Sequence, residues 1–423
     1  MKKMFFSISI LIWSLCFLQA QELFIVNSNS CTLSKVNIEN YSVNNSFALL
    51  GEYANQVIYD RNKLYVVNSG DNNIVILNSE TGQLINTIQL GNSVNPWNIL
   101  LHNEYAYVTG LFSGKVYKVE LRNTQHIIDL DVGNAPQALA IDNGLLYVSI
   151  TGGYPLYSES KIAIIDLNTF TVIDYIEVPT NPSEMVIDTN GFMHIICTGN
   201  YANTTSQVVI INLANREIVH TLALNWSFYS TIQLGVNNLI FVGNAYGLGF
   251  YTYNQNTFEV VNGYGNFLFA GCDRLLFDED YLYPVKSDFY SASILYFYRH
   301  DYSFVRQISL AIGANSMAYK KNDVSIIDNT NAYSINLQVF PTPFNPEVLI
   351  SFTLENPDYA SLTIFNSKGQ KIKSLFNAKI NQGLHQFLWQ ATDQQGHKVA
   401  SGVYFCQLIV NEKTVLKKMV LLK

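Results

Sequence analysis

LYVVNSGDNNIVILNSETGQLINTI, residues 64–88, reverses its direction twice within 25 residues. Its three apolar runs, LYVV, IVIL and LINTI, are separated by NSGDNN and NSETGQ. Runs of β-branched and aromatic residues bounded by Gly, Asn, Asp and Ser are typical of short strands joined by tight turns. Three such strands cannot bury both faces of the ribbon that they form, so the stretch predicts neighbouring units of the same kind.

The same pattern recurs along the chain. Similar strand-like runs begin at seven positions: Leu23, Leu64, Ala106, Leu146, Met193, Ile240 and Leu282. The steps between these starts are 41, 42, 40, 47, 47 and 42 residues. An all-strand repeat of ~40–45 residues is the signature of a β-propeller, with one four-stranded sheet in each repeat. The sequence therefore predicts an all-β chain whose main part, residues 21–337, is a seven-bladed β-propeller.

We name the strands of each blade A to D, from the central channel to the rim. The opening stretch then supplies strands B, C and D of one blade, and strand A precedes them. The first repeat lacks its own strand A, and NSMAYKK (315–321) can supply it by pairing with the strand at Leu23–Asn27. Closure of this kind removes two unpaired sheet edges. DVSIID and AYSIN, further along the chain, leave an incomplete eighth blade as the alternative.

The N-terminus carries the features of a secretory signal peptide over residues 1–20. Lys2 and Lys3 precede an apolar run from Phe5 to Leu18, and Leu-Gln-Ala precedes Gln21. The run is shorter than the ~18 residues of a membrane span, and no later segment is long enough to be one. We therefore expect an exported protein without a membrane span, either secreted or on the outer cell surface.

Charge and cysteine content narrow the classes of function. Of the 423 residues 48% are hydrophobic and 13% are charged, which is ordinary for a globular core. Residues 21–337 carry a net charge of −13, with no basic stripe, and this excludes nucleic acid as the main partner. Four cysteines remain after the signal peptide, with no CxxC pair, so we expect buried thiols rather than a zinc site. Nothing in the sequence indicates a cofactor.

A second domain begins where the 42-residue rhythm stops, at VFPTPFNP (339–346). Three prolines within six residues form a stiff connector. About seven short strands follow within residues 338–423, which is typical of an Ig-like sandwich. The charge also changes sign, to +4 over this segment.

The motifs of this second domain carry a resemblance. PFNP, SKGQKIKSL, GHKVASGVYFCQL and the terminal KKMVLLK occur in the order found in the C-terminal sorting domain of the type IX secretion system, which residues 339–423 resemble. That family is also similar to the Ig-like domain of flagellar hook-capping proteins. Thr342 and Gln390 depart from the family's usual Asn and Asp. The resemblance implies that residues 338–423 engage the type IX secretion machinery.

The blades resemble YVTN-type repeats, with LYVVNSGDNNIVILNSETGQLINTIQLG as the closest copy. This second resemblance implies a propeller fold rather than an activity, since propellers of this kind include adhesins, scaffolds and a few enzymes.

Catalysis on such a scaffold requires groups that converge on the channel. One aligned position of strand A provides Gln56, Asn98, Glu184 and Arg274, which we call the channel ring. A metal-dependent hydrolase or lactonase would use the first three as ligands. The simpler alternative is that Glu184 pairs with Arg274 or is solvated. A calcium site prefers six to eight oxygens, and this ring has one carboxylate, so we assign neither catalytic nor metal-binding residues.

Two longer repeats indicate a binding surface instead. Their extra residues fall in the B–C loops of adjacent blades, TGGYPLYSES (151–160) and TGNYANTTSQ (198–207), on the channel face where D–A connections also lie. Insertions on one face of a repeat fold often mark its binding face. The candidate residues of this loop ledge are Tyr154, Tyr157, Tyr201, Phe289, Tyr290 and Trp97.

Tyrosine rings among Asn, Ser and Thr suit sugars or peptides, although the tyrosines of the ledge can also simply pack their own loops. Together these features predict a non-catalytic propeller that binds an extracellular glycan, peptide or surface protein.

Overall fold

The computed structural model describes residues 21–225, 227–287, 290–320, 337–341, 343–354, 357–366, 370–410 and 413–422. The chain divides into two compact units, Met1–Asp323 and Val324–Lys423. The described residues form strands and one short 3₁₀-helix, η1 (Ser28–Ser30), and none of their helices is long and apolar enough to cross a membrane. The predicted signal peptide, residues 1–20, lies outside the described residues.

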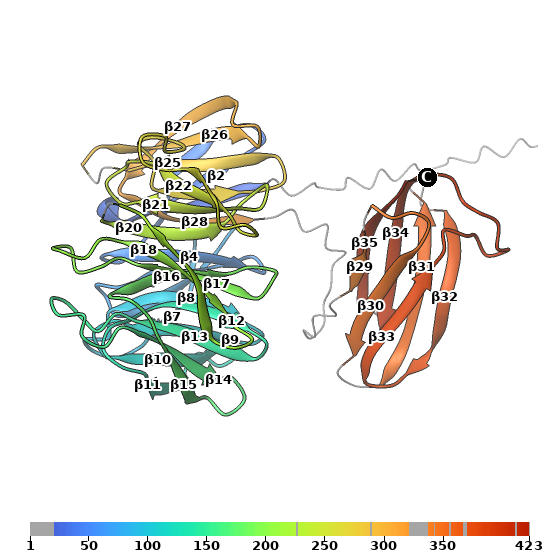
Figure 1. Ribbon diagram of the computed structural model, residues 1–423, viewed down its shortest axis with the longest axis horizontal. Coiled ribbons are helices and arrows are strands. Elements are labelled where there is room, and N and C mark those ends of the chain that lie inside the picture. The colour runs from blue at the N-terminus through green and yellow to red at the C-terminus, as the bar shows by residue number, and fades with distance from the viewer. Residues whose placement is uncertain are drawn as a thin grey trace, which may run out of the picture. The chain divides into compact units, whose positions relative to one another are not determined.

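The first unit is a ring of seven four-stranded antiparallel sheets, as predicted (Figure 1). Blade 1 contains β28 (Ala314–Lys320), β1 (Glu22–Asn27), β2 (Thr32–Asn37) and β3 (Val43–Leu49). Blade 2 contains β4 (Ala54–Asp60), β5 (Lys63–Asn68), β6 (Asn73–Asn78) and β7 (Leu84–Gln89). Blade 3 contains β8 (Pro96–His102), β9 (Tyr105–Gly110), β10 (Lys115–Glu120) and β11 (Ile127–Asp131).

The remaining blades repeat this order. Blade 4 contains β12 (Pro136–Asp142), β13 (Leu145–Ile150), β14 (Lys161–Asp166) and β15 (Thr171–Glu177). Blade 5 contains β16 (Pro182–Ile187), β17 (Phe192–Cys197), β18 (Gln207–Asn212) and β19 (Glu217–Ala223). Blade 6 contains β20 (Tyr229–Leu234), β21 (Leu239–Asn244), β22 (Phe250–Asn254) and β23 (Val260–Asn262). Blade 7 contains β24 (Arg274–Phe277), β25 (Tyr281–Lys286), β26 (Ala292–Arg299) and β27 (Phe304–Ile312).

Burial across a blade follows the sequence pattern. The B strands are continuous apolar runs because both of their faces pack against neighbouring blades; in β1, for example, all six residues are buried. The D strands alternate or are largely exposed, as in β19, because they form the outer edge of each sheet. The cores therefore lie between successive blades.

The ring closes through the predicted strand. β28 pairs with β1 in antiparallel register, with Leu23 opposite Tyr319 and Val26 opposite Ser316. Figure 1 shows the first and last blades side by side, and β1, β2 and β3 of blade 1 contact β27 of blade 7. The prediction of closure is confirmed. DVSIID and AYSIN fall within residues 321–336, outside the described residues.

An ion cluster stabilises this closure. Lys320, at the end of β28, is 1% exposed and contacts both Glu22 of β1, at 3.2 Å, and Glu80 of blade 2. Lys35 of β2 contacts the other oxygen of Glu22 at 2.8 Å. The last strand of the ring is thus bound to the first through charges that are largely removed from water.

Three of the four described cysteines are buried, as expected, and Cys31 is only half-buried. Within the described residues the four are free thiols, and Cys197, Cys272 and Cys406 are buried. Burial raises the pKa of Cys406 to about 12, so its thiol stays protonated and unreactive.

The second unit contains a two-layered β-sandwich. One sheet consists of β29 (Gln338–Phe340), β30 (Val348–Leu354) and β33 (Gly383–Trp389). The other consists of β32 (Lys371–Ile380), β31 (Asp358–Asn366), β34 (Gly402–Val410) and β35 (Lys413–Leu421). Trp389, which is fully buried, packs on Phe344 and Tyr404 between the two sheets. The expected Ig-like fold of this segment agrees with the structure.

Lys320→Ala should destabilise the propeller by about 3 kcal/mol, because it leaves the buried Glu22 with one cation in place of two and removes the tie to blade 2. Lys115→Ala is the matched control, since Lys115 pairs with Asp129 at a site where both side chains are about one-third exposed or more. This control should have little effect on stability, because solvent screens the interaction of exposed ion pairs. Urea unfolding of the full chain measures both. Equal, small effects of the two substitutions would show that the cluster does not stabilise closure.

Candidate functional site

The two faces of the propeller differ in their side chains. One face carries the B–C and D–A loops, and we call it the aromatic face. It displays exposed aromatic side chains at seven positions: Tyr53, Phe112, Tyr154, Tyr201, Tyr246, Tyr264 and Tyr290. The described residues of these loops include no Lys, Arg or His, and their acids are Glu52, Asp71, Glu159 and the buried Asp273.

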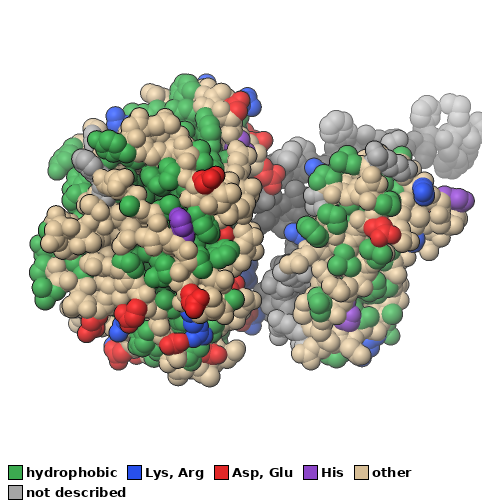
Figure 2. All heavy atoms as spheres, viewed as in Figure 1, with side chains coloured by type: hydrophobic (Ala, Val, Ile, Leu, Met, Phe, Trp, Pro, Cys, Tyr) green, Lys and Arg blue, Asp and Glu red, His purple; other side chains and the backbone are tan. Residues whose placement is uncertain are grey.

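The A–B and C–D loops, on the opposite face, are charged. They carry both signs, including Arg61, Glu104, Arg122, Arg216 and Glu279, and no exposed aromatic side chain among the described residues. Figure 2 shows acidic and basic side chains close together at the lower edge of the visible side of the propeller, and elsewhere scattered among larger green and tan areas. Aromatic rings are therefore concentrated at one end of the channel.

Five of the rings on the aromatic face form a continuous row across blades 4, 5 and 6. Ring centroids are 6.2 Å apart for Tyr154 and Tyr157, and 6.1 Å apart for Tyr157 and Tyr201. Tyr201 stacks on Phe228 at 5.0 Å, and Phe228 meets Tyr246 edge-on at 4.6 Å. We call these five residues the aromatic row.

The backbone of the row is strained. Tyr157, Tyr201 and Phe228 have φ values of 47°, 59° and 70°. Left-handed conformations cost non-glycine residues on the order of 1 kcal/mol each and concentrate at functional sites. The loops hold these rings in place at an energetic cost.

The structure brings together part of the predicted loop ledge. Tyr154, Tyr157 and Tyr201 are neighbours, as the side-by-side insertions predicted. Tyr290 is 92% exposed on the B–C loop of blade 7, and Phe289 lies outside the described residues. Sequence reasoning missed Phe228, which lies in a D–A loop, and Tyr246, which lies in a B–C loop of ordinary length.

A cavity of about 920 Å³ opens between the blades and is lined by both Tyr53 and Tyr201 of the aromatic face; we call it the mouth cavity. Trp97, the sixth candidate of the ledge, lines this cavity rather than the loops. All four channel-ring residues also line it. A second cavity of about 470 Å³ shares Gln56, Asn98, Glu184 and Ile232 with the first. Gln56, Asn98 and Glu184 of the channel ring therefore lie between the two cavities, whereas Arg274 borders only the first.

Amides and hydroxyls dominate the polar lining of the mouth cavity. The uncharged polar residues that line it include Asn55, Asn95, Asn98, Gln137, Ser183, Ser230, Thr231, Asn315 and Ser316. These come from the A strands and the D–A loops of several blades, because every A strand borders the channel.

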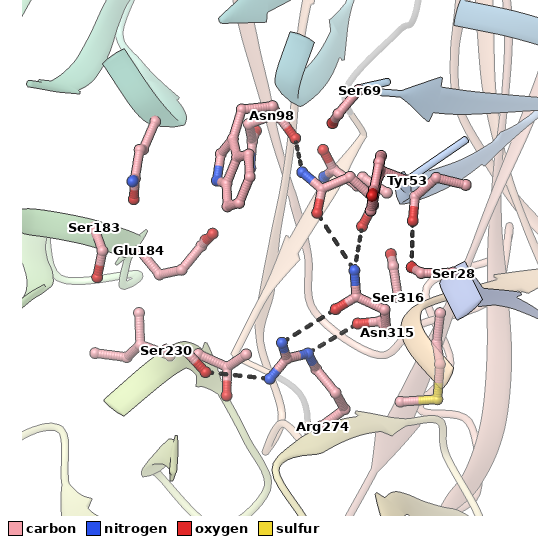
Figure 3. Close-up of a pocket in the computed structure, with 18 of the residues that line it drawn as sticks. Ser28, Tyr53, Ser69, Asn98, Ser183, Glu184, Ser230, Arg274, Asn315 and Ser316 are labelled. Carbon is pink, nitrogen blue, oxygen red and sulfur yellow. Dashed lines mark hydrogen bonds between the residues drawn. The ribbon is translucent and has the colours of Figure 1, made fainter. Parts of the chain in front are cut away.

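Arg274 is held by a hydrogen-bond network (Figure 3). Its Nε donates to the carbonyl of Asn315 at 2.8 Å, and its guanidinium donates to the hydroxyl of Ser230 at 3.2 Å. The ion pair of Arg274 is with Asp273, at 2.9 Å. Of the two alternatives expected for Glu184, an ion pair with Arg274 or solvation, the ion pair is wrong, because the N–H groups of Arg274 bond to Asp273, Asn315 and Ser230 instead. Burial raises the pKa of Asp273 to about 6, and Arg274 opposes this shift.

Glu184 has a different environment. In Figure 3 its carboxylate points into the open part of the cavity, and no described residue hydrogen-bonds to it. Burial raises the pKa of Glu184 to about 7, against the lowering effect of Arg274. Glu184 is thus the one carboxylate of the described lining, and Arg274, the one cation of that lining, is already paired.

The site offers few side chains that could act as ligands of a metal ion. Gln56 Oε1 already accepts the backbone N–H of Ile99 at 2.6 Å, which leaves Glu184 and Asn98 as the other proposed ligands. No group of three or more His, Cys, Asp or Glu among the described residues is arranged to hold a metal ion. The arrangement suits the binding of a polar ligand by hydrogen bonds and ring contacts.

Comparison with known proteins supports the fold. Residues 345–411 match the model of the FlgD Ig-like domain. The chain is similar to Kuenenia stuttgartiensis hydrazine synthase, with a TM-score of 0.52 and 14% identity over 63% of this chain and 89% of that chain. The fold of the chain is therefore a β-propeller followed by an Ig-like domain.

Two further solved structures are less similar. A protein of unknown function from Bacteroides caccae has a TM-score of 0.45 and 11% identity over 71% of this chain and 99% of its own. The dihydro-heme d1 dehydrogenase NirN has a TM-score of 0.48 and 11% identity over 70% of this chain and 74% of its own. No curated protein matches the chain.

Glu184→Gln should stabilise the protein at pH 8 and have little effect at pH 5. Between about pH 4.5 and pH 7 the folded protein keeps a proton on Glu184 that the unfolded chain has lost, so the free energy of unfolding falls as the pH rises through this window. The isosteric amide removes that penalty, for a gain of about 2 kcal/mol at pH 8.

Urea unfolding at the two pH values measures this effect, and Glu52→Gln, which removes an exposed carboxylate outside the cavity lining, is the control. A loss of stability at pH 8 in the Glu184→Gln protein would contradict the assignment of Glu184 as an uncompensated carboxylate.

Proposed function

We propose that this chain is an exported, non-catalytic binding protein that holds a glycan, peptide or surface protein on its aromatic face. The observation that carries the proposal is the asymmetry of the propeller, with seven exposed aromatic side chains and no described basic side chain in the loops of one face. Exposed apolar surface concentrated in this way marks binding sites in soluble proteins.

Among these ligands a glycan fits the aromatic face best. The flat rings of Tyr154, Tyr201 and Tyr246 offer apolar surfaces for the CH faces of sugars, and their hydroxyls remain available for hydrogen bonds. The amide and hydroxyl groups of the mouth cavity match the alternating donors and acceptors of sugar hydroxyls. An anionic ligand would find no described cation in these loops to bind it.

We further propose that residues 338–423 direct the protein through the type IX secretion machinery to the outer cell surface or the medium. The match of residues 345–411 to an Ig-like domain supports a separately folded module, and the sorting-domain motifs continue beyond it to the C-terminus. A separately folded module of this kind directs the protein to its location and does not contribute to ligand binding.

Tyr154→Ala combined with Tyr201→Ala should abolish glycan binding while leaving the melting temperature nearly unchanged. Both side chains are exposed, at 82% and 42%, and substitutions at exposed loop positions usually cost less than about 0.5 kcal/mol. A glycan array followed by calorimetry measures binding, and Phe304→Ala is the control, because Phe304 is an exposed aromatic on the outer strand β27. A large drop in melting temperature with unchanged binding would mean that the row only packs its own loops.

Truncation after Asn336 should leave a β-rich propeller with its melting temperature close to that in the full chain. In the native host this shortened protein should accumulate in the periplasm, and a reporter fused to residues 338–423 should leave the cell. Cell fractionation and immunoblotting follow both proteins. If the shortened protein reached the outside at normal levels, the sorting role would be lost and the sandwich would be a structural appendage.

A further inference from the structure

The mouth cavity joins two features that have been described separately. Tyr53 and Tyr201 border it on the aromatic face, while Glu184 lines it at the channel ring. A chain-like ligand lying on the aromatic face can therefore extend its terminal unit into the same cavity, toward Glu184. The volume of about 920 Å³ is in the range of ligand sites, which are about 300–1,000 Å³.

The charge balance of the cavity is incomplete. Arg274 is paired with Asp273 and bonded to Ser230 and Asn315, so its positive charge is already compensated. The carboxylate of Glu184 has neither an ion pair nor a hydrogen bond from any described residue. Glu184 is half-buried, and a carboxylate that loses part of its hydration without gaining a partner is destabilising. A cation that enters the cavity relieves that cost.

We propose that the mouth cavity binds the protonated amino group of an amino sugar against Glu184. The inference rests on the proposed glycan-binding function and names the class of glycan. The ammonium group supplies the missing cation, while the ring hydroxyls bond to the surrounding amides and hydroxyls. Trp97, which also lines the cavity, provides an aromatic surface for the sugar ring.

The titratable groups around Glu184 do not compete with it for the ammonium group of such a ligand. The strands packed against β16 are β12, β13, β17 and β20. Their titratable side chains are Asp142, Tyr147, His194, Cys197 and Tyr229. His194 is fully buried with its ring nitrogens on Tyr253 and Asp188, and Arg274 across the channel is the charged group that acts on Glu184. In the second cavity Asp60 is paired with Arg61.

The test compares trimers of glucosamine and of N-acetylglucosamine, which differ in the charge of the amino group. Calorimetry at pH 7 should show that the full chain binds the glucosamine trimer at least about tenfold more tightly, the value of a charged hydrogen bond. Glu184→Gln should remove about this factor for glucosamine and leave the N-acetylated trimer unchanged. Glu39→Gln, which removes an exposed acid in the C–D loop of blade 1 on the opposite face, should change neither.

A pH series gives a second readout. The wild-type affinity for the glucosamine trimer should rise severalfold from pH 5.5 to pH 7, because Glu184 must lose its proton to pair with the ammonium group. The Glu184→Gln protein should show no such rise. Its own unfolding curve shows that it is folded in each measurement.

Three outcomes would overturn the inference. The first is equal binding of the two trimers, and the second is unchanged binding of the glucosamine trimer by the Glu184→Gln protein. The third is tighter binding of trilysine than of the glucosamine trimer, which would assign the cavity to a lysine side chain. If the N-acetylated trimer still bound through Tyr154 and Tyr201 in these cases, glycan binding on the aromatic face would stand without the amino-sugar site. Loss of all glycan binding would remove both proposals.

Discussion

The antiparallel pairing of β28 with β1 is the contact on which the rest of the propeller depends. Without it blade 1 lacks its innermost strand and the ring has two unpaired edges. Charges reinforce this seam, since the buried Lys320 contacts Glu22, which is also buried, and Glu80, whose side chain is 45% exposed. Closure also fixes the channel, because each A strand can face the axis only when seven blades complete the circle.

The order in which the strands are connected brings the aromatic side chains together on one face of the propeller. Every B–C and D–A loop emerges on the same face, so residues that lie far apart in the sequence become neighbours. Tyr154, Tyr201 and Phe228 come from three different loops, yet their rings form one row with Tyr157 and Tyr246. The strained backbone of three of these residues is maintained by the rigid sheets beneath them.

Glu184 illustrates a conflict between stability and binding. Its raised pKa, about 7, reports that the folded protein is better off with this side chain neutral. An Arg that could compensate it lies across the same cavity but is occupied by Asp273. A site that leaves a carboxylate uncompensated in this way is prepared for a cation, and the stability that it loses is recovered when the proposed ligand binds.

The amino-acid sequence by itself determined the fold class, the seven blades, the closing strand and the Ig-like second domain, because strand and turn signals are local and the repeat makes them redundant. It also identified Tyr154, Tyr157 and Tyr201 from loop length, and the residues of the channel ring from their register. Only the tertiary structure placed Phe228 and Tyr246 beside them, and only it showed that Arg274 is paired with Asp273 rather than with Glu184. Those facts depend on which side chains meet across blades and across the channel, and such distances are set by ring closure and not by any local pattern.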